Sequence, residues 1–223
     1  LTVLTGFVET LQSLPLEADE RSRYLGLMGQ QAQRMGTLVQ DLLTLSRLEG
    51  SAAPPMNQWT RVRALLAHCE DEARGLSERL SAQGHRLFFA IESDSEISGA
   101  ATELQSAMSN LVSNAVRYTP PGGEVTVTWR LLPDGRGEFA VRDSGPGIAA
   151  EHIPRLTERF YRVDRSRSRE TGGTGLGLAI VKHVVQRHGA QLRIESTPGQ
   201  GSRFALLFPV TRLRPARPVS VTA

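Results

Sequence analysis

Four glycines crowd the stretch from residue 172 to 177, directly before an apolar run of helix length: Gly172, Gly173, Gly175 and Gly177. A glycine inside a helix costs about 1 kcal/mol relative to alanine, so glycines here indicate that a ligand approaches the backbone closely. Free N–H groups at a helix start, together with the positive end of the helix dipole, bind phosphate. Taken alone, the stretch fits a glycine-rich turn with tight helix packing equally well.

A carboxylate at the end of a predicted strand is the second candidate. Asp143 follows the strand-like residues 138–142 and precedes Gly145 and Gly147. An aspartate in this position can accept a hydrogen bond from the exocyclic amine of a base, and the glycines permit backbone conformations closed to other residues.

Two asparagines and an arginine share one face of a predicted helix. Asn110, Asn114 and Arg117 are four and three residues apart, and Tyr118 follows them. The amide oxygens suit a hard cation such as Mg²⁺, the guanidinium suits phosphate, and the aromatic ring suits a base. Alone, this run also fits a solvated polar stripe. The three stretches in this order predict a nucleotide site.

These stretches resemble the ATP-binding region of bacterial two-component sensor histidine kinases, and the resemblance covers nearly the whole chain. The boxes of this family are matched in order: residues 110–118 resemble the N box, 143–148 the first glycine box, 158–164 the F box, 173–177 the second glycine box and 199–202 the last glycine turn. Within the family, residues 42–49 and 151–164 are most similar to the sensor kinases of the phosphate regulon.

The resemblance implies the cytoplasmic catalytic core of a sensor kinase, with ATP and Mg²⁺ as cofactors. Such a core transfers the γ-phosphate of ATP to a histidine and then to an aspartate in the receiver domain of a response regulator, here in phosphate-starvation signalling. Arg117 and Arg162 would act in catalysis, with Arg162 at the terminal phosphate. Asn110 and Asn114 would hold Mg²⁺. The implied nucleotide-binding residues are Asn110, Asn114, Arg117, Tyr118, Asp143, Gly145, Gly147, Ile148, Phe160, Tyr161, Arg162, Gly173, Thr174, Gly175, Leu176, Gly177 and Leu178.

The phosphate-accepting histidine of the family lies in a His-Glu-Leu-Arg-Thr-Pro segment, which the resemblance would place immediately before Leu1. The five histidines of the chain lie elsewhere, and none is on the first predicted helix: His68, His85, His152, His183 and His188. We therefore expect this chain to bind ATP without phosphorylating itself at the family's site.

Apolar residues at helical spacing predict two helices in residues 1–49. The first ends at Pro15, the second carries an apolar stripe over residues 24–45, and a short polar turn at 17–21 is expected between them. Two helices cannot bury both stripes alone, so the pattern favours a dimeric four-helix bundle with a second copy of the chain. We expect this homodimer to be weakened because the first helix lacks its beginning. Paired prolines in residues 50–57 predict a linker.

A mixed pattern follows and predicts an ATP-binding domain over residues 58–210. The expected elements are an amphipathic helix at 62–73, a strand at 87–91, a helix at 102–117, a hairpin of strands at 124–131 and 138–142, a helix at 176–188, and strands at 191–195 and 202–208. Helices and mostly antiparallel strands in this order predict a two-layer α/β sandwich, similar to the GHKL type, and an α+β chain overall. The Pro- and Arg-rich tail at 211–223 is expected to be disordered.

A polar, basic segment without an apolar period precedes the glycines, at residues 162–171. Its composition indicates a solvated loop, and its position predicts a mobile lid whose arginines close over a triphosphate. Phe160 would anchor this lid by packing.

Composition agrees with a folded, cytoplasmic fragment that binds no nucleic acid. Of the 223 residues, 39% are hydrophobic, which is enough to form a core, and the net charge is only +3. Cys69 is the single cysteine, which excludes a disulfide framework and a thiolate zinc cluster. No apolar run approaches the roughly 20 residues that cross a bilayer, and no signal peptide opens the chain. We expect membrane contact only through segments outside this chain, in a full-length protein of the bacterial inner membrane.

Other nucleotide-binding folds fit less well. A Rossmann dehydrogenase would need a strand before the glycines, where this chain has a basic loop, and a Walker NTPase needs a Gly-Lys-Ser/Thr tripeptide that the chain lacks. The related ATPases of the gyrase, MutL and heat-shock chaperone type lack the F box and the helical hairpin. A GHKL-type ATPase and a non-catalytic nucleotide-binding dimerisation module both remain open, and a phosphotransfer assay separates them from a kinase.

Overall fold

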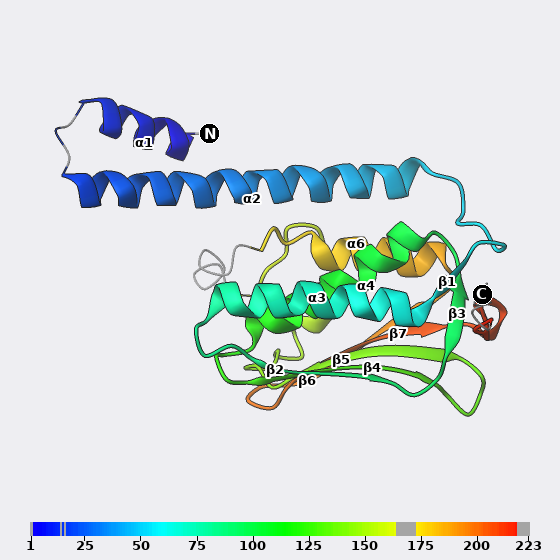
Figure 1. The fold of residues 1–223 in the computed structure, drawn as a ribbon. Coiled ribbons are helices and arrows are strands. Elements are labelled where there is room, and N and C mark those ends of the chain that lie inside the picture. Colours follow the sequence, from blue (N-terminus) through cyan, green and yellow to red (C-terminus); the bar gives the residue numbers. More distant parts are fainter. Residues whose placement is uncertain (1, 14, 16, 164–172, 218–223) are drawn as a thin grey trace, which may run out of the picture.

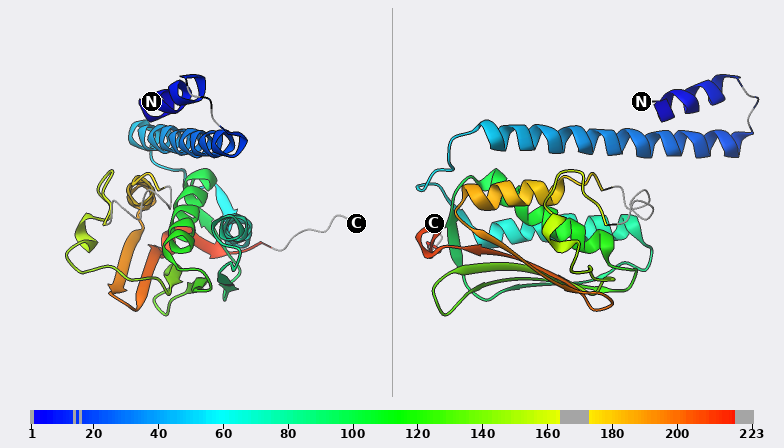
Figure 2. Two further views of the ribbon diagram at one scale, coloured as in Figure 1. Left: turned by 90° about the vertical axis from the view of Figure 1, so that its left-hand side faces the viewer. Right: turned by 180° about the vertical axis from the view of Figure 1, so that it is seen from behind.

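Two helices open the chain, and a domain with two sheets follows them (Figure 1). The computed structural model describes residues 2–13, 15, 17–163 and 173–217. Helix α1 (Thr2–Ser13) lies on the side of α2 (Ala18–Gly50) that faces away from the sheets (Figure 2). The rings of Phe7 and Tyr24 join the two helices, with 5.8 Å between their centroids. The predicted helical hairpin is confirmed.

The turn between the two helices is shorter than expected. We predicted a polar turn at residues 17–21, but α2 already begins at Ala18. Glu17 forms a capping box with Glu20, whose carboxylate accepts a hydrogen bond from the Glu17 N–H at 3.3 Å. Asp19 and Glu20 lie in the first turn, where negative charge complements the helix dipole. The polar residues therefore mark the start of the helix and do not form a loop.

The domain is built on a five-stranded sheet with the strand order β2-β4-β5-β7-β6. Its strands are β2 (Arg86–Ile91), β4 (Glu124–Leu131), β5 (Gly137–Asp143), β6 (Gln191–Thr197) and β7 (Gly201–Phe208). Strands β2 and β4 run parallel, and the other neighbours in this sheet pair antiparallel. The predicted hairpin is formed by β4 and β5, with Val127 opposite Val141.

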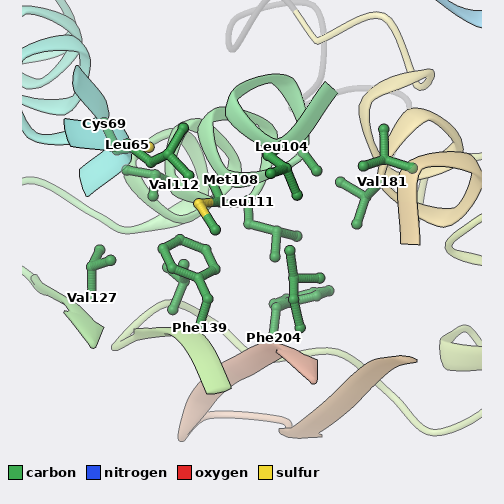
Figure 3. Close-up of a cluster of buried hydrophobic side chains, with 14 of the residues drawn as sticks. Leu65, Cys69, Leu104, Met108, Leu111, Val112, Val127, Phe139, Val181 and Phe204 are labelled. Carbon is green, nitrogen blue, oxygen red and sulfur yellow. The ribbon is translucent and has the colours of Figure 1, made fainter. Parts of the chain in front are cut away.

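Three helices cover one face of this sheet: α3 (Val62–Leu80), α4 (Ala101–Tyr118) and α6 (Gly177–Arg187) (Figures 1 and 2). The core lies between the two layers. Met108 and Leu111 of α4 are at most 1% exposed, and they point toward Phe139 and Phe204 of the sheet (Figure 3). Burying one such side chain stabilises the fold by about 1.5 to 3 kcal/mol. The predicted two-layer α/β sandwich is confirmed.

A second, small sheet was not predicted. It has the order β1-β3-β8 and consists of β1 (Trp59–Arg61), β3 (Ser95–Ser98) and β8 (Leu213–Pro215), all antiparallel. Two short 3-10 helices, Ile153–Arg155 and Val210–Arg212, complete the described elements.

The predicted disorder of the tail is wrong for Leu213–Pro215, because these residues pair with β3. The arginines that suggested a solvated tail have partners in the domain. Arg212 donates to the carbonyl oxygen of Ser98 at 3.3 Å, and Arg214 pairs with Glu96 at 2.6 Å and lies 4.1 Å from the Trp59 ring centroid. Residues 218–223 lie outside the described part of the chain.

Helix α2 also lies along the helical layer of the domain (Figure 1). Leu45 and Leu48 on its second half are 2% and 5% exposed. At the end of α6, the Arg187 guanidinium donates to the carbonyl oxygens of Leu48 and Ser51, each at 2.9 Å, and pairs with Glu103 at 3.0 Å. The second half of α2 is therefore docked on the domain. Among the described residues, no helix combines the length and apolar composition that a membrane span requires.

Candidate nucleotide-binding site

A cavity of about 300 Å³ opens where β5 ends beside the second half of α4. Its apolar walls come from Ala115, Pro146, Ile148, Leu156, Val163 and Phe204, and its polar groups include those of Asn114, Tyr118, Asp143, Arg162 and Ser202. Gly147 and Tyr161 also line it. An apolar cavity with a few directed polar groups is typical of a small-molecule site and has the chemistry that a flat base needs. Seven of the residues singled out from the sequence meet here: Asn114, Tyr118, Asp143, Gly147, Ile148, Tyr161 and Arg162.

Asp143 is the buried carboxylate of this cavity, with 7% of its surface exposed. Burial raises its pKa, and hydrogen bonds from the backbone N–H groups of Gly145 and Ser202 act in the opposite direction. The Gly145 N–H donates to Oδ1 at 2.9 Å. Gly145 therefore acts by orienting the carboxylate. Ile148 is held by its own N–H, which donates to Ser196 Oγ at 2.8 Å.

A second cavity of about 130 Å³ adjoins the first. The two share Asn114, Tyr118, Leu156, Tyr161 and Arg162 in their walls, so they lie side by side. The smaller cavity is also lined by Asn110, Arg117, Gly173, Thr174, Gly175, Gly177 and Leu178. The structure thus brings the N-box helix and the glycine loop together around one polar space.

Two arginines bring positive charge to this polar space. Burial lowers the pKa of both Arg117 and Arg162 below the ordinary value of an arginine. A buried guanidinium has lost hydration that an anion can replace. Arg162 also donates to the carbonyl oxygen of Gly173, which ties it to the glycine loop. The smaller cavity is therefore suited to phosphate groups.

The two asparagines differ in their surroundings. The Asn110 amide nitrogen donates to the Ser106 carbonyl oxygen at 2.8 Å, and its Oδ1 lies so close to Gly177 that a Cβ there would be 2.4 Å away. Asn110 therefore packs the glycine loop against α4. Asn114 lines both cavities. The described residues hold no group of three or more His, Cys, Asp or Glu that could bind a metal.

The glycine loop joins the F box through its backbone. Gly175 has φ +76°, and a Cβ there would lie 3.0 Å from the Cα of Phe160. The Phe160 N–H donates to the Gly175 carbonyl oxygen at 2.9 Å. Phe160 itself has φ +62°, and its side chain is 56% exposed. The main chain thus holds the residue in place, and its predicted packing against the lid stays a prediction, because most of the lid lies outside the described residues.

Tyr161 is one of the F-box side chains that line the site, with Arg162 and Val163. Its hydroxyl lies 2.7 Å from His152 Nδ1, and the Arg155 guanidinium lies 4.3 Å from its ring centroid. These contacts fix the ring at the boundary of the two cavities. The predicted lid falls largely on residues 164–171, which lie outside the described part of the chain.

Thr174 and Leu176 form the entry to α6. The Leu176 N–H donates to Thr174 Oγ1 at 3.2 Å, which closes a turn before the helix. The side chain of Leu176 is fully buried in the core and does not line either cavity. Of the glycine-loop residues predicted to bind nucleotide, Leu176 is thus the one whose side chain faces elsewhere.

Two residues of α2 line the smaller cavity and were missed by the sequence analysis: Thr37 and Asp41. Thr174 Oγ1 donates to Asp41 Oδ2 at 2.6 Å. Burial raises the pKa of Asp41, while the hydrogen bond from Thr174 and the charge of Arg117 lower it. The only signal in the sequence was an acidic residue that interrupts the apolar stripe between Leu38 and Leu45.

Two protein families match parts of the chain. Residues 99–212 match the family described as Histidine kinase-, DNA gyrase B-, and HSP90-like ATPase, and residues 1–51 match the His Kinase A (phospho-acceptor) domain. The chain belongs to this ATPase family, and its combination with the His Kinase A domain makes it a member of the two-component sensor histidine kinases. The resemblance drawn from the N, glycine and F boxes is confirmed.

Comparison with curated relatives shows which sensor kinases the chain is similar to. The phosphate regulon sensor protein PhoR of Pseudomonas aeruginosa is 47% identical over 209 residues, covering 93% of this chain and 46% of the relative. The sensor-like histidine kinase SenX3 of Mycolicibacterium smegmatis is 36% identical over 208 residues, covering 92% of this chain and 53% of the relative. The predicted similarity to phosphate-regulon sensor kinases is confirmed. The chain spans about half the length of the curated relatives it matches.

Solved structures agree on the fold. Full-length ShkA in complex with AMPPNP superposes with a TM-score of 0.67 at 29% identity, over 93% of this chain and 42% of that one. The Acinetobacter baumannii histidine kinase AdeS superposes with a TM-score of 0.70 at 20% identity, over 94% of each chain, which supports the fold alone.

Proposed function

We propose that this chain binds Mg-ATP and donates its γ-phosphate to a histidine. The adenine occupies the larger cavity, where its amine donates a hydrogen bond to Asp143. The phosphates occupy the smaller cavity beside Arg117, Arg162 and the glycine loop. Asn114, supported by Asn110, holds Mg²⁺. The observation that carries this proposal is the junction of the two cavities, one apolar with a buried carboxylate and one lined by asparagines and arginines.

The phosphate then passes to an aspartate in the receiver domain of a response regulator, in signalling that responds to phosphate starvation. The 47% identity to a phosphate regulon sensor protein supports this part of the proposal. We divide the chain into a dimerisation hairpin at 1–49, a linker at 50–57 and a catalytic domain that starts at 58. The two family matches, at 1–51 and 99–212, support this division. Membrane attachment would belong to segments outside this chain.

The test is transfer from γ-labelled ATP to a separate helical hairpin that carries the family's His-Glu-Leu-Arg-Thr-Pro segment. Transfer needs chiefly positioning and charge neutralisation. We expect no acid-labile label on the chain alone and labelled hairpin once the two are mixed. Arg162→Ala should abolish labelling, and Arg193→Ala, an exposed arginine on β6, should leave it unchanged.

The other outcomes separate the alternatives. Release of phosphate without labelled hairpin would favour a GHKL-type ATPase. Nucleotide binding with neither hydrolysis nor transfer would favour a non-catalytic dimerisation module. Label on the chain alone would show that one of its five histidines accepts phosphate.

A further inference from the structure

An acidic residue of the dimerisation hairpin reaches the phosphate end of the candidate site. Asp41 lies on the face of α2 that also carries Leu45 and Leu48, at the spacing i, i+4, i+7. The two leucines are buried, so this face is the one docked on the catalytic domain. Asp41 is only partly exposed, and its Oδ2 accepts the hydrogen bond from Thr174 at 2.6 Å across 133 residues of sequence.

The carboxylate lies among the groups that suit phosphate. Asp41 lines the smaller cavity together with Asn110, Asn114 and Arg117. Its hydrogen-bond donor, Thr174, belongs to the glycine loop that leads into α6. Burial raises the pKa of Asp41, and the positive charge of Arg117 acts in the opposite direction, toward the ionised form. A negative oxygen from α2 therefore already occupies the environment that a phosphate oxygen would take.

The carboxylate and a triphosphate cannot share this space favourably. The cavity holds about 130 Å³, and like charges in a partly buried site repel one another more strongly than in water. The bound anion, either the Asp41 carboxylate or the triphosphate, interacts with the positive charge of Arg117 and accepts the hydrogen bond from the Thr174 hydroxyl. By thermodynamic linkage, a ligand that excludes Asp41 weakens the docking of α2 by the same factor by which docking weakens the ligand.

We propose that Asp41 is an internal competitor for the phosphate end of the site, displaced when a nucleoside triphosphate binds, so that the triphosphate releases α2 from the glycine loop. This inference rests on the proposed function. The linker end of α2 is held by different contacts: Arg187 binds the carbonyl oxygens of Leu48 and Ser51, and Glu49 pairs with Arg159. Asp41 lies seven residues before Leu48, which is about 10 Å along the helix at 1.5 Å per residue. Release therefore begins at Asp41, while these contacts keep the linker end attached.

The test compares the affinity of Mg-ATP and of adenosine for the full chain and for Asp41→Asn. Asparagine has the same shape and still accepts the Thr174 hydrogen bond, so only the charge is lost. We expect Asp41→Asn to bind Mg-ATP between about threefold and tenfold more tightly, the range for loss of a partly exposed charged competitor, with adenosine affinity unchanged. Asp19→Asn removes the same charge from an exposed position on the same helix and should change neither affinity.

Each other result overturns the inference. Equal Mg-ATP affinity in Asp41→Asn and the unchanged chain would leave the proposed function standing and remove the competition. Weaker Mg-ATP binding by Asp41→Asn would make Asp41 a ligand of the nucleotide or its metal. Failure of every form to bind either ligand would end the proposed function and this inference together.

A second measurement needs no variant. Hydrogen exchange of the α2 amides at residues 38–44 reports docking around Asp41, because an undocked helix frays more readily. Saturating Mg-ATP should speed this exchange in the unchanged chain, and adenosine, which carries no phosphate, should not. Exchange that is unaffected by Mg-ATP, or slowed by it, contradicts displacement of Asp41.

Discussion

A single carboxylate sets how the larger cavity can recognise a base. Asp143 is buried, and its Oδ1 is oriented by the Gly145 N–H at 2.9 Å. Each hydrogen bond that a buried carboxylate accepts stabilises its ionised form. The bonds from Gly145 and Ser202 therefore oppose the rise in its pKa caused by burial. A ligand would add one more hydrogen bond to this carboxylate, and the exocyclic amine is the donor that adenine offers.

Asp143→Asn should therefore weaken Mg-ATP binding strongly. The substitution keeps the shape of the side chain but replaces a charge-assisted hydrogen bond, and the loss should be about 1.5 to 3 kcal/mol, or roughly tenfold to over a hundredfold in affinity. Isothermal titration calorimetry measures it directly. Asp134→Asn, in the exposed β4–β5 turn, is the control and should bind normally. Unchanged affinity in Asp143→Asn would refute the role of Asp143.

At the scale of the elements, the small sheet shows how the tail contributes to the domain. Glu96 of β3 is 6% exposed and pairs with Arg214 of β8 at 2.6 Å and with Arg61 of β1 at 3.7 Å. One buried carboxylate thus holds the two outer strands on the central one. Arg212, beside β8, is itself buried and donates to carbonyl oxygens of Ser98 and Pro55.

Arg214→Ala should lower the free energy of unfolding by about 1 to 3 kcal/mol, because Glu96 would stay buried with only the longer contact to Arg61. Urea unfolding followed by circular dichroism measures the change. The matched control is Arg193→Ala in β6, whose pair with Glu195 is exposed, with 65% and 46% of the two side chains accessible. This change should cost less than about 1 kcal/mol. Equal losses in the two variants would show that the Glu96 contacts do not stabilise the sheet.

The elements that could be predicted from the sequence are those with a local signal. The alternation of β4 and the glycine turn before β5 are local, and so is the face of α4 that carries Asn110, Asn114 and Arg117. The three strands of the small sheet have no such signal, because they are three or four residues long and pair with strands far away in the sequence. In β3, buried Ser95, Glu96 and Ser98 resemble a loop until their partners are known, such as the Trp129 Nε1–H that donates to Ser95 Oγ at 2.8 Å.

In the candidate site too, the residues with a local sequence signal could be predicted. Asp143 and the residues of the glycine loop could be singled out because they lie at predicted strand and helix ends and match the boxes of the family in order. Asp41 could not be found, since its place in the smaller cavity depends on how α2 docks on the domain. The exposure of the Phe160 ring was also beyond the sequence, because it follows from the positive φ of that residue and its main-chain bond to Gly175.

At the scale of the whole molecule, the two faces of α2 have different surroundings. One face carries Leu45 and Leu48 and is covered by the catalytic domain. The neighbouring face presents Val39, Leu42 and Leu43, which are 53%, 40% and 48% exposed. Their spacing of i, i+3, i+4 is that of a helix seam that packs on another helix. Helix α1, on the far side of α2, leaves this part of the stripe uncovered among the described residues.

We therefore predict that Leu43→Asp disrupts a homodimer formed through α2. In a symmetric dimer the substitution occurs twice, and each lost leucine contact costs about 1.5 to 3 kcal/mol, so the dimer dissociation constant should rise at least about a hundredfold. Sedimentation velocity over a wide concentration range measures it. Leu131→Asp places the same change on an equally exposed leucine of β4, at 47%, and should leave the dimer intact. A dimer that resists Leu43→Asp, or that Leu131→Asp breaks equally, would show that this face of α2 is not where two copies meet.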